Sequence, residues 1–185
     1  HCTGSGAPTV ILEAGASSFS IDWALVQAEI AKTNRVCSYD RARMGWSDPG
    51  PVDSAANIVR DLKTLLEAAN EKSPYVLVGA SMGGIYVRVV QMRYPNDVVG
   101  IVLVDPTHEF RLFTTVSGKA VPIASLTSEE YQAVLPQGYV TIPRRQPQTG
   151  EPFTRLPENL YKTRVELDQR LIDSFPDSVG PEVVA

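Results

Sequence analysis

The residues with the clearest chemical potential are Gly79-Ala80-Ser81-Met82-Gly83, in which a serine has a glycine two positions before it and another two positions after it. A serine hydroxyl can be the nucleophile of acyl transfer when a base activates it. The pattern stands between an apolar run at 75–80 and a helix-like segment at 82–94. A sharp strand-to-helix turn would strain the serine backbone and expose its hydroxyl, and only small residues fit at the glycine positions. We therefore expect Ser81 to be a nucleophile rather than an incidental serine in a glycine-rich turn.

The same turn would bring an oxyanion donor to the serine. Ser81 would lie at the positive end of the following helix, where the helix dipole favours negative charge. The backbone N–H of Met82 would then point to the place where an oxyanion forms during acyl transfer. Gly79 and Gly83 are expected to shape this elbow without taking part in the chemistry.

A serine nucleophile needs a general base, and the sequence has two histidines, His1 and His108. His1 precedes the first predicted strand. His108 and Asp105 follow Ser81 in an acceptable order, but one short loop is poorly suited to present both acid and base in line with it. We favour a surface role for His108. Asp105 ends a predicted parallel strand, where sites form in α/β sheets; it is a candidate acid, although capping of the turn before Pro106 is the favoured interpretation.

These residues belong to a region, 1–106, in which strand-like and helix-like segments alternate. Apolar runs predict strands at 8–15, 35–40, 75–80 and 97–106, and helical spacing predicts helices at 20–33, 54–70 and 82–94. Strands that are apolar throughout and separated by helices belong to a parallel sheet covered on both faces. The predicted fold class is therefore α/β, with a mostly parallel sheet flanked by helices.

Two of the predicted helices have candidate N-caps and apolar faces. For 20–33 the cap is Ser20 and the face is Ile21, Leu25, Val26 and Ile30. For 54–70 the cap is Ser54 and the face is Ile58, Leu62, Leu65 and Leu66.

From residue 107 onward the chain is rich in proline, and only 128–135 and 158–174 have a helical pattern. No further buried strand is predicted. We expect two parts: a core at 1–106 and a lid or cap segment at 107–185 that runs over one face of the sheet.

The ordered motifs resemble those of the α/β-hydrolases. The elbow around Ser81 matches, and residues 10–15 resemble the strand and turn that supply a second oxyanion donor, so that Gly15 matches the family's glycine and Ala16 would provide the N–H. Residues 38–51 resemble the turn that follows the next strand in the family, and residues 100–106 resemble the strand before the lid. In the turn at 38–51 the matching residues are Asp40, Arg41, Gly45, Ser47, Asp48 and Pro49.

Three positions depart from the family pattern. Ala80 stands where many relatives have histidine, Ala14 replaces the histidine of a His-Gly pair, and Arg43 stands where the turn usually has glycine. Arg43 is expected to alter the local backbone. None of the three removes the nucleophile or its oxyanion donors.

The resemblance implies that the core is incomplete at both ends. The family's usual acid, its catalytic histidine and its last strands follow the lid, and strands also precede residue 9. The sequence begins without methionine or a signal peptide, which predicts a fragment or processed product. A second chain or segment is therefore expected to complete the fold.

The resemblance implies a serine hydrolase that forms an acyl-enzyme with carboxylic esters, or with lactones or amides. Serine in place of aspartate argues against epoxide hydrolase or dehalogenase chemistry. The alternative is a non-catalytic binding or structural subunit with the same fold, which the missing histidine favours. A nucleotide-binding domain is excluded because residues 13–18 form neither phosphate-binding pattern.

Composition excludes several partners. The net charge of -4 is spread along the chain, which argues against nucleic-acid binding, and no apolar run approaches the roughly 20 residues of a membrane span. The expected partner is a small ester-like substrate, with no cofactor and no metal. Cys2 and Cys37 are more simply explained as small buried residues than as a disulfide, so the sequence leaves the compartment open.

Overall fold

The computed structural model describes residues 1–16, 18–50, 54–108, 147, 149–151 and 153–170, and the backbone alone of 112–114, 120–122, 140–141, 171–174 and 178–179. The chain divides into two compact units. The first comprises His1–Thr107 with Gln148–Asp168, and the second comprises His108–Pro147 with Gln169–Ala185. The division into a core at 1–106 and a lid at 107–185 stays a prediction.

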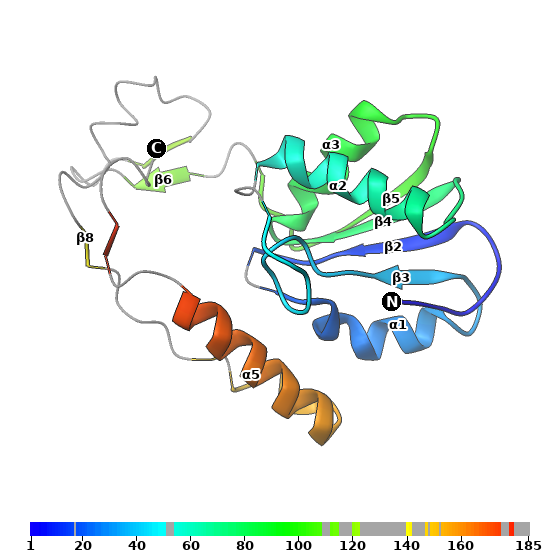
Figure 1. Cartoon of the computed structure of the whole chain (residues 1–185). Coiled ribbons are helices and arrows are strands. Elements are labelled where there is room, and N and C mark those ends of the chain that lie inside the picture. Colours follow the sequence, from blue (N-terminus) through cyan, green and yellow to red (C-terminus); the bar gives the residue numbers. More distant parts are fainter. Residues whose placement is uncertain are drawn as a thin grey trace. The chain divides into compact units, whose positions relative to one another are not determined.

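The first unit is built on a five-stranded sheet in the order β1-β3-β2-β4-β5 (Figure 1). Strands β2 to β5 are parallel, and β1 is antiparallel to β3. The bounds are β1 Cys2–Thr3, β2 Thr9–Glu13, β3 Val36–Ser38, β4 Tyr75–Ala80 and β5 Val98–Val104. The four predicted strands are confirmed. Strand β1 precedes residue 9, where the sequence predicted no strand.

Helices cover both faces of this sheet, as Figure 1 shows. Helices α2 (Ala55–Ala68) and α3 (Gly83–Arg93) lie on one face, and the 3-10 turn η1 (Ser20–Trp23) with α1 (Ala24–Ile30) lies on the other. Strand β2 packs against both layers, because Ile11 belongs to the core cluster of α2 and α3 while Leu12 belongs to the cluster of Trp23. The predicted α/β class is thereby confirmed.

The helix predicted at 54–70 matches α2. The Ser54 side chain accepts a hydrogen bond of 3.2 Å from the Asn57 amide, as expected for an N-cap. Ile58, Leu62 and Leu66 are buried, whereas Leu65 is 43% exposed. Leu65 therefore lies at the margin of the apolar face rather than within it.

The prediction for 20–33 is partly wrong. Ser20 does not cap the helix, because it is the first residue of η1 and Phe19 stands at the N-cap position. The Ser20 amide donates to Asp40 Oδ1 at 2.7 Å. Leu25 and Val26 are each 45% exposed, while Trp23 and Gln27 are buried. The segment begins with a 3-10 turn, which has three residues per turn, so the face expected from a spacing of 3.6 is displaced.

The interpretation of the two cysteines is also wrong. Cys2 and Cys37 are directly opposite each other in the β1–β3 pair and form a disulfide. Their sulfur atoms and a Glu71 carboxylate oxygen form the only cluster with metal-ligand spacing among the described residues, but the disulfide leaves neither sulfur as a thiolate. This cluster therefore ties the edge strand to the sheet.

The remaining elements lie after residue 107. Strands β6 (Leu112–Thr114) and β7 (Ala120–Pro122) form one antiparallel pair, and β8 (Val140–Thr141) and β9 (Ser178–Val179) form another. A short 3-10 turn, η3, spans Phe153–Arg155. The helix predicted at 158–174 is confirmed as α5 (Glu158–Ser174). The helical patch predicted at 128–135 lies outside the described residues. None of the described helices has the length and apolarity to cross a membrane.

Candidate active site

Ser81 stands in the turn between β4 and α3. Its φ is +49°, in the left-handed region that a residue with a side chain rarely adopts, and its side chain is exposed. The Ser81 amide donates to the Val104 carbonyl at 3.1 Å, and the Ser81 carbonyl accepts from the Thr107 amide at 2.8 Å. The strained backbone is therefore held by β5 and by the segment that follows it.

The two flanking glycines are required by close backbone approaches. A Cβ atom on Gly79 would lie 2.6 Å from the Gly83 carbonyl oxygen, and one on Gly83 would lie 2.5 Å from the Glu13 carbonyl oxygen. Both separations are too short for any side chain. At Gly83 the turn thus packs directly on the end of β2, where a Cβ atom has no room.

The turn after β2 lies beside the serine. A Cβ atom on Gly15 would be 3.3 Å from Ser81 Cβ. Arg41 Nη2 donates to the Gly15 carbonyl at 2.5 Å. Because the C=O and N–H of a trans peptide point in opposite directions, the Ala16 amide points away from Arg41. Within the part of the chain that the structure describes, the backbone N–H of Ala16 and that of Met82 donate no hydrogen bond.

A buried polar cluster holds this turn from beneath. Arg41 Nη1 donates to Glu13 Oε1 at 2.6 Å and to the Ala14 carbonyl at 2.7 Å, and Tyr39 donates to the other Glu13 oxygen. Burial and the Glu13 carboxylate raise the pKa of Tyr39 well above its ordinary value. Burial acts to lower the pKa of Arg41, but Glu13 outweighs it and the pKa is raised. Arg41 is therefore cationic and Tyr39 neutral near pH 7.

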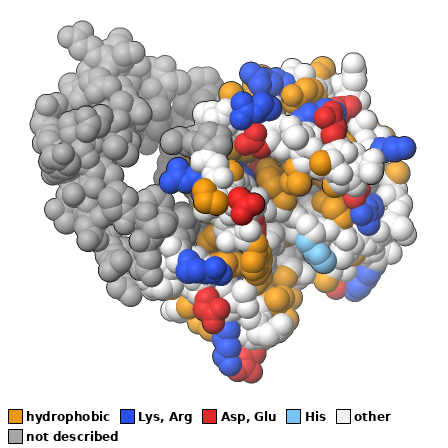
Figure 2. All heavy atoms as spheres, viewed as in Figure 1, with side chains coloured by type: hydrophobic (Ala, Val, Ile, Leu, Met, Phe, Trp, Pro, Cys, Tyr) orange, Lys and Arg blue, Asp and Glu red, His pale blue; other side chains and the backbone are white. Residues whose placement is uncertain are grey.

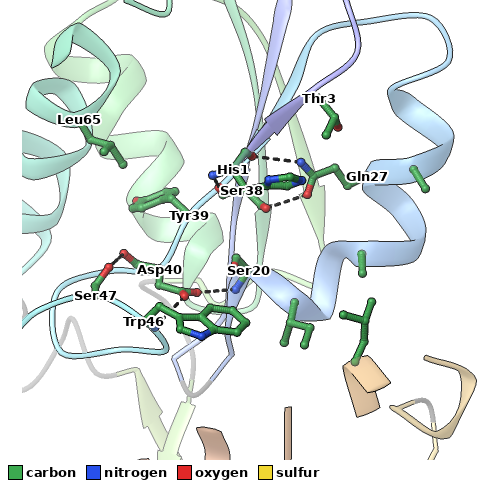
Figure 3. A pocket seen from close by; sticks show the side chains of 14 residues that line it. His1, Thr3, Ser20, Gln27, Ser38, Tyr39, Asp40, Trp46, Ser47 and Leu65 are labelled. Atoms are coloured by element: carbon green, nitrogen blue, oxygen red, sulfur yellow. Dashed lines mark hydrogen bonds between the residues drawn. The ribbon is translucent and has the colours of Figure 1, made fainter. Parts of the chain in front are cut away.

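Asp40 organises the neighbouring turn, which carries the residues matched to the family pattern at 40–49. Its carboxylate accepts from the Ser20 amide at 2.7 Å and from the Trp46 amide at 3.1 Å, while Ser47 Oγ donates to the Asp40 carbonyl (Figure 3). Arg43 has φ +67°, so it keeps the left-handed conformation natural to glycine. The expected effect of Arg43 on the backbone, relative to a glycine at this position, stays a prediction.

Asp105 and the histidines lie differently with respect to Ser81. Asp105 follows β5, whose last residue Val104 pairs with Ala80, so Asp105 and Ser81 come directly after neighbouring strand ends. Asp105 is exposed and has φ +41°. His1 directly precedes β1, which lies three strand spacings, or about 14 Å, across the sheet from β4. His108 is exposed and belongs to the second unit.

A pocket of about 590 Å³ lies elsewhere in the first unit, and Ser81 is not among its lining residues. Figure 3 shows His1, Gln27 and Ser38 joined along one wall. Ser38 Oγ donates to Gln27 Oε1 at 2.7 Å, and Gln27 Nε2 donates to the His1 carbonyl at 3.2 Å. These bonds pair the side chains of Gln27 and Ser38 with each other and with the His1 carbonyl, on a wall that does not include Ser81.

Sequence reasoning did not identify Glu13 and Tyr39 as supporting residues. The signal for Glu13 was present, because a carboxylate inside an apolar strand must find a partner.

Charges are mixed on the face seen in Figure 2, where Lys and Arg are interspersed with Asp and Glu among hydrophobic side chains.

Comparisons with known proteins agree with this geometry. A protein of Bacillus subtilis, the uncharacterized YqjL, is 34% identical over 107 residues, covering 57% of this chain and 42% of the relative. An AB hydrolase superfamily protein of Gibberella zeae is 32% identical over 107 residues, covering 55% and 33%. A candidate lipase structure from Acinetobacter baumannii AYE has a TM-score of 0.61 at 21% identity, covering 93% of this chain and 58% of that one.

The chain thus spans less than half the length of these two curated relatives. The sequence profile described as the alpha/beta hydrolase family matches residues 4–183. The mostly parallel sheet and the glycine-flanked turn after β4 agree with that match. The protein belongs to the alpha/beta hydrolase family.

Proposed function

We propose that the protein is a serine hydrolase that cleaves carboxylic esters through an acyl-enzyme. The observation that carries the proposal is Ser81, an exposed serine with φ +49° in a strand-to-helix turn. Such strain persists only where the surrounding structure enforces it, and it is concentrated at reactive positions. The unoccupied amides of Ala16 and Met82 support the assignment, since an oxyanion requires donors without other acceptors.

In the proposed mechanism Ser81 Oγ bonds to the carbonyl carbon of the ester and gives its proton to a histidine. The amides of Ala16 and Met82 hold the oxyanion, and the histidine returns the proton to the departing alcohol. Water then attacks the acyl-enzyme with the same base, which releases the acid and restores Ser81. We assign the histidine, together with the family's usual acid, to a part of the complete protein outside this chain, and Asp105 is the candidate acid within it. The segment 107–185 would act as a lid that sets the substrate shape, and lactones or amides are further candidate substrates.

The second candidate is a non-catalytic binding or structural subunit of the same fold. One observation favours it: His1, the histidine of the first unit, is across the sheet from β4. The two candidates differ in one property, the reactivity of Ser81.

A fluorophosphonate probe applied to the natural full-length protein tests the proposal. We expect covalent labelling that disappears in Ser81→Ala and persists in Ser5→Ala, which removes an exposed serine near the N-terminus. Hydrolysis of a short-chain nitrophenyl ester should be lost in Ser81→Ala to the same extent. Absence of labelling of the folded wild-type protein would favour the non-catalytic subunit instead.

A further inference from the structure

A fully buried arginine links α5 to the turn beside Ser81. The Arg164 side chain has no exposed area, and its Nε donates to Asp22 Oδ1 at 2.9 Å across a sequence separation of 142 residues. Its Nη1 donates to Asp168 Oδ2 at 3.1 Å, four residues further along the helix. A guanidinium removed from water requires such partners, so the three charges form one unit.

Aromatic rings complete the enclosure of the guanidinium. The Arg164 Cζ atom lies 3.9 Å from the centroid of the Phe153 ring and 5.8 Å from that of the Phe19 ring. Both separations are within the range of cation–π attraction. Phe19 is itself fully buried, and it immediately precedes η1. The cluster therefore joins the α5 segment to the end of the turn that follows β2.

Asp22 transmits this contact into the turn. Its Oδ2 accepts from the Phe19 amide at 3.2 Å, and the Asp22 amide donates to the Phe19 carbonyl at 3.1 Å. Further toward the serine, the Ser18 amide donates to the Gly15 carbonyl at 3.3 Å. These bonds lead from Arg164 to Phe19, and the next residue toward the serine, Ser18, is bonded to Gly15, which directly precedes Ala16.

The turn is thus fixed by two buried arginines from different directions. Arg41 binds the carbonyl oxygens of Ala14, Gly15 and Ala16. Arg164, acting through Asp22, binds the end of the turn at Phe19. A donor that must meet an oxyanion needs to be held in place before the reaction, because displacement by about 1 Å can cost about 100-fold in rate.

We propose that Arg164 and Asp22 are positioning residues that hold the Ala16 amide beside Ser81 and make its placement depend on docking of α5. The inference rests on the proposed serine hydrolase function. It assigns a role in transition-state stabilisation to a helix that is distant in sequence and that contributes no group to the chemistry. Loss of the pair should therefore lower kcat more than it changes KM.

The test compares Arg164→Met, Arg164→Lys and Asp22→Asn in the natural full-length protein. The control is Lys162→Met on the same helix, which removes an exposed cation paired with Glu158. We expect Arg164→Met and Asp22→Asn to lower kcat about 10- to 100-fold with KM within about threefold of wild type. Arg164→Lys, which keeps the charge but not the planar fork, should recover part of the loss. Lys162→Met should match wild type.

Hydrogen exchange of the Phe19 amide provides a readout that does not depend on activity. In the natural full-length protein we expect faster exchange of this amide in Asp22→Asn than in Lys162→Met. If Arg164→Met fails to fold, Asp22→Asn decides, since it preserves the size of the side chain. A folded Asp22→Asn with wild-type kcat and wild-type exchange would overturn the inference. If the wild-type protein has no reactive serine, the proposed function fails, and the exchange measurement alone decides whether the pair positions the turn.

Discussion

At the scale of single residues, Gly83 is the position where the fold leaves the least room beside Ser81. A Cβ atom there would meet the carbonyl oxygens of Glu13 at 2.5 Å and Ala14 at 2.8 Å, and both belong to backbone that cannot rotate away. We expect Gly83→Ala to destabilise the fold by about 1–3 kcal/mol, as overpacking does, and to lower the labelling rate of Ser81. The urea midpoint measures the first effect and the fluorophosphonate probe measures the second.

The matched control for this substitution is Gly150→Ala, because nothing lies within 4 Å of a Cβ atom at Gly150. Its urea midpoint should equal that of wild type or rise slightly, since alanine restricts the unfolded chain more than glycine does. Equal midpoints for both variants would contradict the close packing of the elbow on β2.

Arg43 carries a separate residue-scale consequence. Its φ of +67° is strained for arginine, and the turn is held by a 2.9 Å bond from the Arg43 amide to the Asp48 carbonyl. We expect Arg43→Gly to stabilise the protein by up to about 1 kcal/mol, because relief of the strain exceeds the added entropy of the unfolded chain. Arg43→Ala, which keeps a Cβ atom, should bring no gain in thermal unfolding experiments. A loss of stability in Arg43→Gly would show that the contacts of the Arg43 side chain stabilise the fold by more than the backbone strain destabilises it.

At the scale of elements, the two-residue strand β1 depends on its covalent link. The disulfide between Cys2 and Cys37 closes a loop with a sequence separation of 35, for which the chain-entropy relation gives about 4 kcal/mol. We expect reduction with dithiothreitol to lower the free energy of unfolding by about 2–4 kcal/mol. Cys2→Ala/Cys37→Ala should show the same loss without reductant and no further response to it. A wild-type urea midpoint unchanged by reductant would contradict this role.

The elements also show how far sequence patterns reach. Local signals were enough for β4, α2 and α5, because apolar runs, helical spacing and an N-cap are properties of adjacent residues. The buried face of α1 was not predictable from a spacing of 3.6, since the segment begins with a 3-10 turn.

Long-range pairs were beyond the reach of those patterns. The disulfide requires the register of β1 with β3, and the Arg164–Asp22 pair joins residues 142 positions apart. In the candidate site, the glycine spacing predicted the elbow, while the support from Glu13 and Arg164 appears only when the chain is folded. What the sequence could not provide was therefore the set of contacts that hold the reactive turn in place.

At the scale of the whole molecule, helices cover both faces of the sheet in the first unit, but side chains of its last strand, β5, are exposed. Strand β5 is the last strand of the sheet in the described residues, and Val99, Val102 and Val104 on it are 62%, 49% and 45% exposed. An apolar edge of this kind usually packs against other structure. The predicted incompleteness of the core accords with coverage of 58% of the solved candidate lipase.

Two ion pairs that connect different layers of the first unit give its stability a defined pH dependence. Hydrogen bonding to Arg35 lowers the pKa of Glu71 from its ordinary 4.5, and hydrogen bonding to Lys63 lowers the pKa of Asp97 from 3.8. The unfolded chain binds these protons first as the pH falls, so the stabilisation is complete above about pH 5 and is lost as the pH falls through the lowered folded values. Burial raises the pKa of Asp22, so this carboxyl contributes to the pH dependence with the opposite sign. The variants described next therefore leave Asp22 unchanged.

We expect Glu71→Gln and Asp97→Asn to be less stable than wild type at about pH 7 and to approach it at low pH, once the pH has fallen through the lowered folded pKa values and the wild-type pairs are also lost. Urea unfolding across this range measures the difference, and added salt should reduce it, since Arg35 and Lys63 are partly exposed. Glu166→Gln removes an exposed carboxylate from α5 and should leave the shape of the profile unchanged. Variants whose deficit is the same at both pH values would show that Glu71 and Asp97 stabilise the layers through packing rather than through charge.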